Sequence, residues 1–156
     1  MEKYLIQIIM AFLGTVGFSI FFTVKKSRIW TVGVGGALVW AVFLGVNAVS
    51  GNEMTALLIA SAMASVFAEI LARIVKSPGT VLLMPMLIPL IPGGNLYYTM
   101  FNMVKGNSEA FQSYLQLVLK EAASIAIGIM LIASAVQVIN KIKSYQSNQR
   151  LPGVKL

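Results

Sequence analysis

The sequence predicts an all-α polytopic membrane protein with about five transmembrane helices, the fourth of which is broken by prolines and glycines. Of its 156 residues, 58% are hydrophobic and 11% are charged, whereas a soluble domain carries about 25% charged residues. Short polar turns divide the chain into apolar segments long enough to cross a hydrocarbon core of about 30 Å. We expect one transmembrane domain, residues 1–143, with segments at 4–24, 29–49, 53–76, 80–104 and 109–143. A flexible cytoplasmic tail, residues 144–156, is expected to follow.

Small residues recur every four positions in the second and third segments. They are Gly33, Ala37, Ala41 and Gly45 in the second, and Ala56, Ala60, Ala64, Ala68 and Ala72 in the third. This spacing lets membrane helices approach closely. Because two such stripes exceed the need of one small bundle, we expect them to contact a partner subunit or a second copy of the chain.

The fourth segment contains the most unusual stretch, MPMLIPLIPGGNLYYTMFNMV at residues 84–104. Pro85, Pro89 and Pro92 each remove a backbone donor, and Gly93-Gly94 allows the chain to leave the helical path. We therefore expect two half-helices separated by an irregular turn at Pro92-Gly93-Gly94. Irregular backbone must face protein or a water-filled cavity inside a membrane, and many transporters bind their substrate at broken helices. The alternative is a kinked packing helix or a re-entrant turn without a ligand.

Polar side chains follow this break at helical spacing. Asn95, Thr99 and Asn102 are separated by four and three residues, and Tyr98 lies beside them. A half-helix that begins near Gly94-Asn95 would offer free N–H groups to a carboxylate. The candidate substrate-binding residues are therefore Pro89, Pro92, Gly93, Gly94, Asn95, Tyr98, Thr99 and Asn102.

The charged side chains inside the segments are few. Glu69 is the most deeply placed acid of the third segment, and Arg73 follows four residues later on the same helical face. An acid within a membrane is costly and is often functional, so Glu69 is a candidate proton or ammonium site, and we assign the pair to proton coupling. The alternative is an ion pair that reaches toward the headgroups. Glu121, next to Lys120, is expected at the outer edge of the last span.

The absence of other motifs limits the possible chemistry. The sequence contains neither cysteine nor histidine, which excludes disulfides and the Cys- or His-based metal and catalytic sites. It also contains no nucleotide-binding loop and no nucleophile elbow. We therefore expect no enzyme activity, no cofactor and no bound metal.

The net charge of +7 reflects topology. Nine of the twelve basic residues fall in the loops after segments one, three and five: Lys25, Lys26, Arg28, Arg73, Lys76, Lys141, Lys143, Arg150 and Lys155. The opposite side holds only Lys3, Lys105 and Lys120. The positive-inside rule then predicts an external N-terminus and a cytoplasmic C-terminus. The basic residues are thus assigned to the membrane surface and its anionic lipids, not to nucleic acid.

Three short motifs carry a family resemblance: Gly14-x-x-Gly17-Phe18, then Ile88-Pro89-Leu90-Ile91-Pro92-Gly93, then Tyr98-Thr99-Met100. With them the chain resembles the threonine/serine exporter family over nearly its whole length. It is similar to the small-subunit type, which corresponds to the C-terminal membrane half of the fused exporters. The resemblance implies a bacterial inner-membrane protein that works with a larger membrane subunit. It also implies export of threonine and serine, or of dicarboxylates such as succinate, driven by the proton-motive force.

Two functional hypotheses follow. In the first, the chain is one half of a secondary transporter and the broken segment holds the small-molecule substrate, with Glu69 as the coupling residue. In the second, it is a non-transporting scaffold or assembly subunit that packs through its small-residue stripes, with self-association as a further possibility. Loss of export with intact assembly, on changing Asn95 or Asn102, would favour the first.

The charge distribution generates a topology prediction. Because the native chain has no cysteine, a single cysteine at Asn107 can be labelled from either side of the membrane. We expect an impermeant thiol reagent to label it from outside the cell. Labelling from the cytoplasmic side alone would contradict the five-segment topology.

Overall fold

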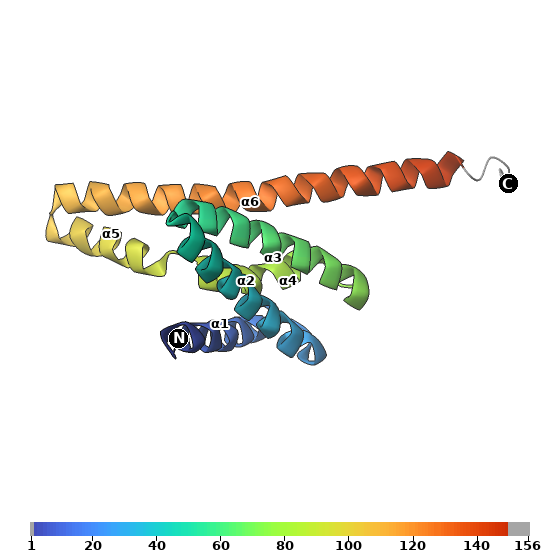
Figure 1. Cartoon of the computed structure of the whole chain (residues 1–156), viewed down its shortest axis with the longest axis horizontal. Helices are drawn as coiled ribbons and strands as arrows, with labels where there is room; N and C mark the ends of the chain where they lie inside the picture. Colours follow the sequence, from blue (N-terminus) through green and yellow to red (C-terminus); the bar gives the residue numbers. More distant parts are fainter. Residues whose placement is uncertain (1, 150–156) are drawn as a thin grey trace.

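The computed structural model describes residues 2–149 as helices joined by short turns, with no strand in that range (Figure 1). The elements are α1 (Glu2–Phe21), η1 (Lys26–Arg28), α2 (Ile29–Ser50), α3 (Glu53–Val75), α4 (Gly79–Leu87), η2 (Ile88–Leu90), α5 (Gly93–Lys105) and α6 (Ser108–Gln149). Four of the helices, α1, α2, α3 and α6, are each long and apolar enough to cross a membrane. The bent pair formed by α4–η2 and α5 supplies a fifth span if it counts as one. The all-α polytopic prediction, including the broken fourth segment, is therefore confirmed.

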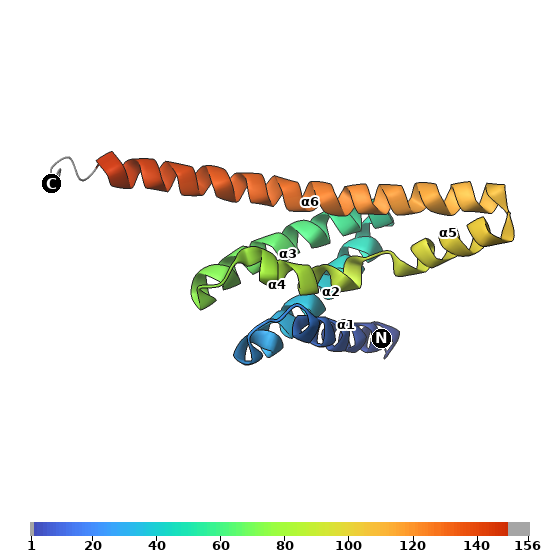
Figure 2. The same cartoon turned by 180° about the vertical axis from the view of Figure 1, so that it is seen from behind.

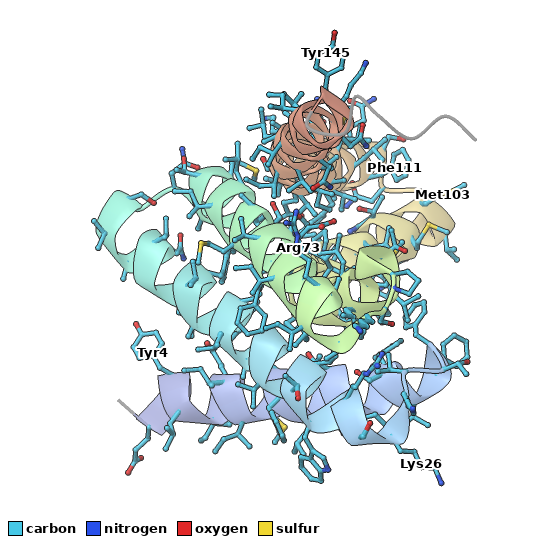
Figure 3. All side chains as sticks on the ribbon, turned by 90° about the vertical axis from the view of Figure 1, so that its right-hand side faces the viewer. Tyr4, Lys26, Arg73, Met103, Phe111 and Tyr145 are labelled. Atoms are coloured by element: carbon cyan, nitrogen blue, oxygen red, sulfur yellow. The ribbon has the colours of Figure 1, made fainter. Side chains whose placement is uncertain are left out.

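The helices are arranged in successive layers. The long helix α6 runs along one edge of the molecule, and α5 lies antiparallel to its first half (Figures 1 and 2). Viewed along the long axis, α3 lies beneath α6, and α1 lies on the opposite side of the molecule (Figure 3). The largest contacts are between α3 and α6, α1 and α2, and α2 and α3. Helix α4 packs against α2 and α3, which places the break in the middle of the bundle.

The buried core lies where α2, α3 and α4 meet. It comprises two clusters of side chains, one beside the break and one nearer the start of α4. The first contains Val39, Phe43, Ala56, Leu57, Ala60, Ala64 and Leu90. The second contains Val24, Val32, Ala68, Leu71, Leu82 and Met86. The backbone of α4 and η2, which leads into the break, is thus held in place because both clusters pack it against α2 and α3.

The small-residue stripes are used mainly within the chain. Ala56, Ala60 and Ala64 are fully buried in the core, and Gly36 is so close to Thr15 of α1 that an added Cβ would collide with it. Gly45, in contrast, is exposed, and an added Cβ there would meet no atom within 4 Å. The prediction that Ala64 contacts a partner was therefore wrong, since its methyl group fills space between this chain's own helices.

Two helix ends differ from the predicted positions. The first helix ends at Phe21, not at residue 24, because Thr23 adopts φ 58°, a left-handed conformation that is rare for a β-branched residue. The last helix continues to Gln149, beyond the predicted end at 143. No glycine or proline interrupts residues 129–149, and the first helix breaker after them is Pro152. The rest of the predicted tail, residues 150–156, lies outside the described residues.

The contact between α3 and α6 generates a stability prediction. A Cβ added at Gly128 would collide with Ser61 Oγ and would lie 2.5 Å from the carbonyl oxygen of Leu58 and 3.1 Å from the amide nitrogen of Ala62. Backbone atoms cannot move aside cheaply, so Gly128→Ala should destabilise the fold by about 1–3 kcal/mol, as overpacking does. Thermal unfolding in detergent measures this loss.

The matched control is Gly45→Ala, since that position is helical, exposed and surrounded by open space. Replacing an exposed helical glycine by alanine should raise stability slightly, by about 0.5–1 kcal/mol. Equal melting temperatures for the two variants would contradict the close packing of α6 on α3.

Candidate functional site

The break lies at Ile91 and Pro92. Ile91 is extended, with φ −66° and ψ 125°, as expected for a residue before proline. Pro92 follows with φ −76° and ψ 60°, and α5 begins directly at Gly93. The two halves are bent by 65°. The irregular turn therefore lies one residue earlier than predicted, because Pro92 already sets the change of direction.

The two glycines after the break have a role other than an unusual backbone angle. Neither Gly93 nor Gly94 has a positive φ, and a Cβ added to either would meet no atom within 4 Å. Glycine without steric need, beside open space, allows another molecule to approach the backbone closely. The pair thus exposes the first turn of α5.

A cavity of about 220 Å³ lies against this turn, and we call it the break cavity. Its walls come from α2, α3, the turn, the start of α5, and α6. It is lined by Trp40, Phe43, Glu53, Leu57, Pro89, Leu90, Ile91, Pro92, Gly93, Gly94, Asn95 and Glu121. Pockets for drug-sized ligands have about 300–1,000 Å³, so this volume suits a small metabolite.

One hydrogen bond joins the two sides of the break cavity. The side-chain amide Nδ2 of Asn95 donates to Oε1 of Glu121 over 2.6 Å, linking α5 to α6. Glu121 is only 1% exposed, and its second oxygen, Oε2, is buried without a partner in the described part of the chain. Buried carboxylate oxygens in proteins normally have a hydrogen-bond partner, so this one has an unused capacity to accept a hydrogen bond.

Backbone N–H groups at the start of α5 and the side chain of Trp40 border the break cavity. The N–H of Gly93 is used by the carbonyl oxygen of Ile91 at 2.7 Å, and the N–H of Leu96 by that of Pro92 at 3.0 Å. The first turn of an α-helix leaves its remaining N–H groups without an intrahelical acceptor, and at α5 these belong to Gly94 and Asn95. Trp40 adds an indole N–H that is buried and unpartnered within residues 2–149.

The predicted substrate-binding residues divide into two groups. Five of them line the break cavity: Pro89, Pro92, Gly93, Gly94 and Asn95. Tyr98, Thr99 and Asn102 do not, because they use their side chains elsewhere. The Thr99 hydroxyl donates to the carbonyl oxygen of Asn95 (2.8 Å), the Asn102 amide donates to that of Tyr98 (2.7 Å), and the Tyr98 ring stacks on Tyr114 at 5.3 Å.

The two residues of the predicted coupling pair lie against different helices. Arg73 reaches across to α6, where one of its guanidinium nitrogens donates to Asn140 Oδ1 over 3.1 Å; Figure 3 labels Arg73 on α3 below α6. Glu69 is half-buried, and its Oε1 would lie 3.1 Å from a Cβ added at Gly79, the first residue of α4. A negative charge beside the first turn of a helix is stabilised by the helix dipole. Neither side chain lines the break cavity.

Sequence reasoning missed seven of the twelve residues that line the break cavity, and three of the seven have polar side-chain atoms: Trp40, Glu53 and Glu121. A weak signal existed for Glu121, since it precedes Ile125 by four residues and Gly128 by seven and so shares their helical face. Ile125 packs on the core and Gly128 contacts α3. The neighbouring Lys120 instead indicated a position at the membrane–water interface, and that indication was given more weight than the helical face that Glu121 shares with Ile125 and Gly128.

The Asn95–Glu121 hydrogen bond generates a stability prediction. Asn95→Leu removes the only partner recorded for the Glu121 carboxylate in the described residues, and leaving a buried charged group unpaired costs about 1–3 kcal/mol or more. Asn102→Leu is the matched control, because it loses only a bond to the carbonyl oxygen of Tyr98 on its own helix and leaves no buried carboxylate without a partner. We expect Asn95→Leu to lower the melting temperature clearly more than Asn102→Leu.

A second change tests the cause of that loss. In Asn95→Leu/Glu121→Leu no carboxylate remains to be buried, so much of the lost stability should return. A double variant that is as unstable as the sum of the two single variants would show that the two side chains do not interact.

The comparison with protein families agrees with a multi-pass membrane protein. Residues 7–135 match the family described as Threonine/Serine exporter, ThrE. No curated protein and no solved structure matches the chain. Because the match covers most of the 156 residues, and because the helices have the length and composition of membrane spans, the chain belongs to the threonine/serine exporter family, whose members are membrane transporters and not enzymes.

Proposed function

We propose that this chain is the small subunit of a secondary transporter that exports threonine or serine across the bacterial inner membrane, and that the break cavity binds the substrate. The observation that carries the proposal is the convergence of free α5 N–H groups, an indole N–H and a buried carboxylate in one cavity of small-metabolite size. Dicarboxylates are the second substrate class to be considered.

The substrate carboxylate would bind at the start of α5. The N-terminus of a helix offers backbone N–H groups and a partial positive charge. Gly94 and Asn95 supply the N–H groups, and the Trp40 indole lies in the same cavity. The prolines of the break contribute shape, because Pro89 and Pro92 direct α5 away from α4.

Access to the break cavity would change by motion of the two half-helices. A second cavity of about 290 Å³ lies between α1, α2 and η2, lined by Gln7, Met10, Ala11, Gly14, Trp40, Ile88 and Pro89. Trp40 and Pro89 line both cavities and so lie between them. A change in the 65° bend at Pro92 would shift these two side chains, which is a route to alternating access.

The remaining parts of the proposal concern orientation, coupling and partners. We place the N-terminus outside and the C-terminus in the cytoplasm, as the basic loops indicate. Proton coupling is assigned to Glu69 with Arg73. A larger membrane subunit would cover part of the exposed apolar surface of α5 and α6. The exposed apolar residues of α5 include Leu96, Met100, Met103 and Val104. A second copy of the chain is the other possible partner.

The scaffold hypothesis loses its main support. It rested on small-residue stripes free to bind other proteins, whereas Ala56, Ala60 and Ala64 are buried inside this chain. The polar contents of the break cavity serve no purpose in a scaffold. Transport is therefore the better interpretation.

The substitution Gly94→Ala tests the proposal. A methyl group fits there without a clash and suits a helix, so stability should stay the same or rise by about 0.5–1 kcal/mol. It would nevertheless stand between the α5 N–H groups and a bound carboxylate. Because a hydrogen bond to a charged group is worth about 1.5–3 kcal/mol, we expect threonine export to fall by about tenfold or more.

The measurement is threonine efflux from cells that express the chain together with its larger subunit, with membrane levels of the chain checked in parallel. Gly45→Ala is the control, since it makes the same change at an exposed position of α2 that does not line the break cavity. Unchanged export by Gly94→Ala would exclude the start of α5 as the carboxylate site.

A further inference from the structure

We infer that Glu121 and Glu53 form a cation subsite in the break cavity, which holds the ammonium group of the substrate and makes the exporter select zwitterionic amino acids over dicarboxylates. The inference rests on the proposed function, because it assumes that the break cavity binds the substrate. It adds the residues that recognise the second charged group and the rule by which two substrate classes are separated.

The Glu121 side chain is buried, and only one of its two oxygens has a partner in the described chain. It is 1% exposed, with Oε1 held by Asn95 and Oε2 buried without a partner in the described chain. The bond to Asn95 fixes the orientation of the carboxylate and leaves one oxygen available. An ammonium group, which carries three N–H donors and one positive charge, satisfies both the free lone pair and the charge.

The charged side chains that line the break cavity, among the described residues, are all carboxylates. Two carboxyl side chains line it, Glu53 and Glu121, whereas no lysine or arginine is among the described residues that do so. Buried charges in proteins are normally paired. A cation supplied by the ligand would complete this set, and Glu53 at the first turn of α3 would add a second negative charge from the exposed side of the cavity.

The free donors and the free acceptors at the break cavity belong to different residues. The donors are the N–H groups of Gly94 and Asn95 and the Trp40 indole, and the free acceptors are carboxylate oxygens. An α-amino acid carries one group for each set. A dicarboxylate satisfies the donors, but its second carboxylate would meet Glu121 and Glu53, where like charges repel in a poorly solvated cavity.

The test measures ligand binding by Trp40 fluorescence. The chain has two tryptophans, and Trp30 is 67% exposed and stacked on Phe12, so Trp30→Phe leaves Trp40 as the reporter within the cavity. The full-length chain in lipid nanodiscs is titrated with four compounds: L-threonine, 1-amino-2-propanol, 3-hydroxybutyrate and succinate. The second compound lacks the carboxylate of threonine, and the third lacks its ammonium group.

The expected result is a saturable response to threonine and, at higher concentration, to 1-amino-2-propanol, with succinate binding at least about tenfold more weakly than threonine. Glu121→Gln should raise the Kd for threonine and for 1-amino-2-propanol about tenfold or more and leave that for 3-hydroxybutyrate unchanged. Glu121→Asp should keep part of the amine affinity. Glu109→Gln is the control, because it makes the same change on α6 outside the break cavity.

Several outcomes would overturn the subsite. Unchanged threonine affinity in Glu121→Gln would do so, as would succinate binding that equals threonine binding. Displacement of 1-amino-2-propanol by Na⁺ at constant ionic strength would show that these carboxylates bind a free cation instead of the substrate. If Glu121→Gln fails to fold, the binding of 1-amino-2-propanol and of 3-hydroxybutyrate to the Trp30→Phe chain tests the subsite. A saturable response to 1-amino-2-propanol supports it, and a response to 3-hydroxybutyrate without one to 1-amino-2-propanol overturns it.

The failure of the subsite and the failure of the proposed function have different signatures. If Gly94→Ala lowers threonine export while Glu121→Gln leaves threonine binding unchanged, the cavity is the substrate site and only the ammonium subsite is wrong. If Trp40 does not respond to threonine at all, the break cavity is not the substrate site and the proposed function is wrong as well.

Discussion

The interruption of the helix at Ile91 and Pro92, between η2 and α5, is the constraint on which the rest of the structure depends. Pro89 and Pro92 have no backbone N–H donor, and the N–H groups of Gly93 and Leu96 are paired with nearby carbonyl oxygens. The N–H groups that remain at the start of α5 cannot be satisfied by hydrocarbon. They must therefore face polar atoms or water. The break cavity, bounded on its far side by α6, is the consequence of that requirement.

Close packing of small residues makes the polar contact possible. Gly128 of α6 lies directly against Ser61 and the backbone of α3, which brings α6 near enough for Glu121 to reach Asn95 on the other side of the break. Helices that lack a hydrophobic driving force between them associate through such close contacts and through hydrogen bonds. The position of the acid is thus set by a glycine two turns away along the same helix face.

Most of the fold could be predicted from local sequence, whereas the site could be predicted only in part. Apolar length, basic loops and the prolines of residues 84–104 indicate helices and a break, because these properties act within one segment. Asn95 was recognisable because it follows the break directly. Glu121 was not, since its burial depends on how α6 packs on α3, a contact between residues far apart in sequence. Asn102 has the same side chain as Asn95 and also follows the break at helical spacing, but its amide donates to the carbonyl oxygen of Tyr98 on its own helix.

A transporter must release its substrate as well as bind it, and the arrangement around Glu121 suits that need. If the break cavity binds the substrate as proposed, a ligand would gain one strong acceptor at this residue instead of two, because the side chain of Asn95 occupies the other carboxylate oxygen. When the ligand leaves, the same hydrogen bond keeps the carboxylate partly satisfied and α5 attached to α6. The net free energy of binding would then be only the difference between the ligand-bound state and the ligand-free state, in which Asn95 still pairs with Glu121. A change in the bend at Pro92 would need to supply no more than this difference to release the ligand.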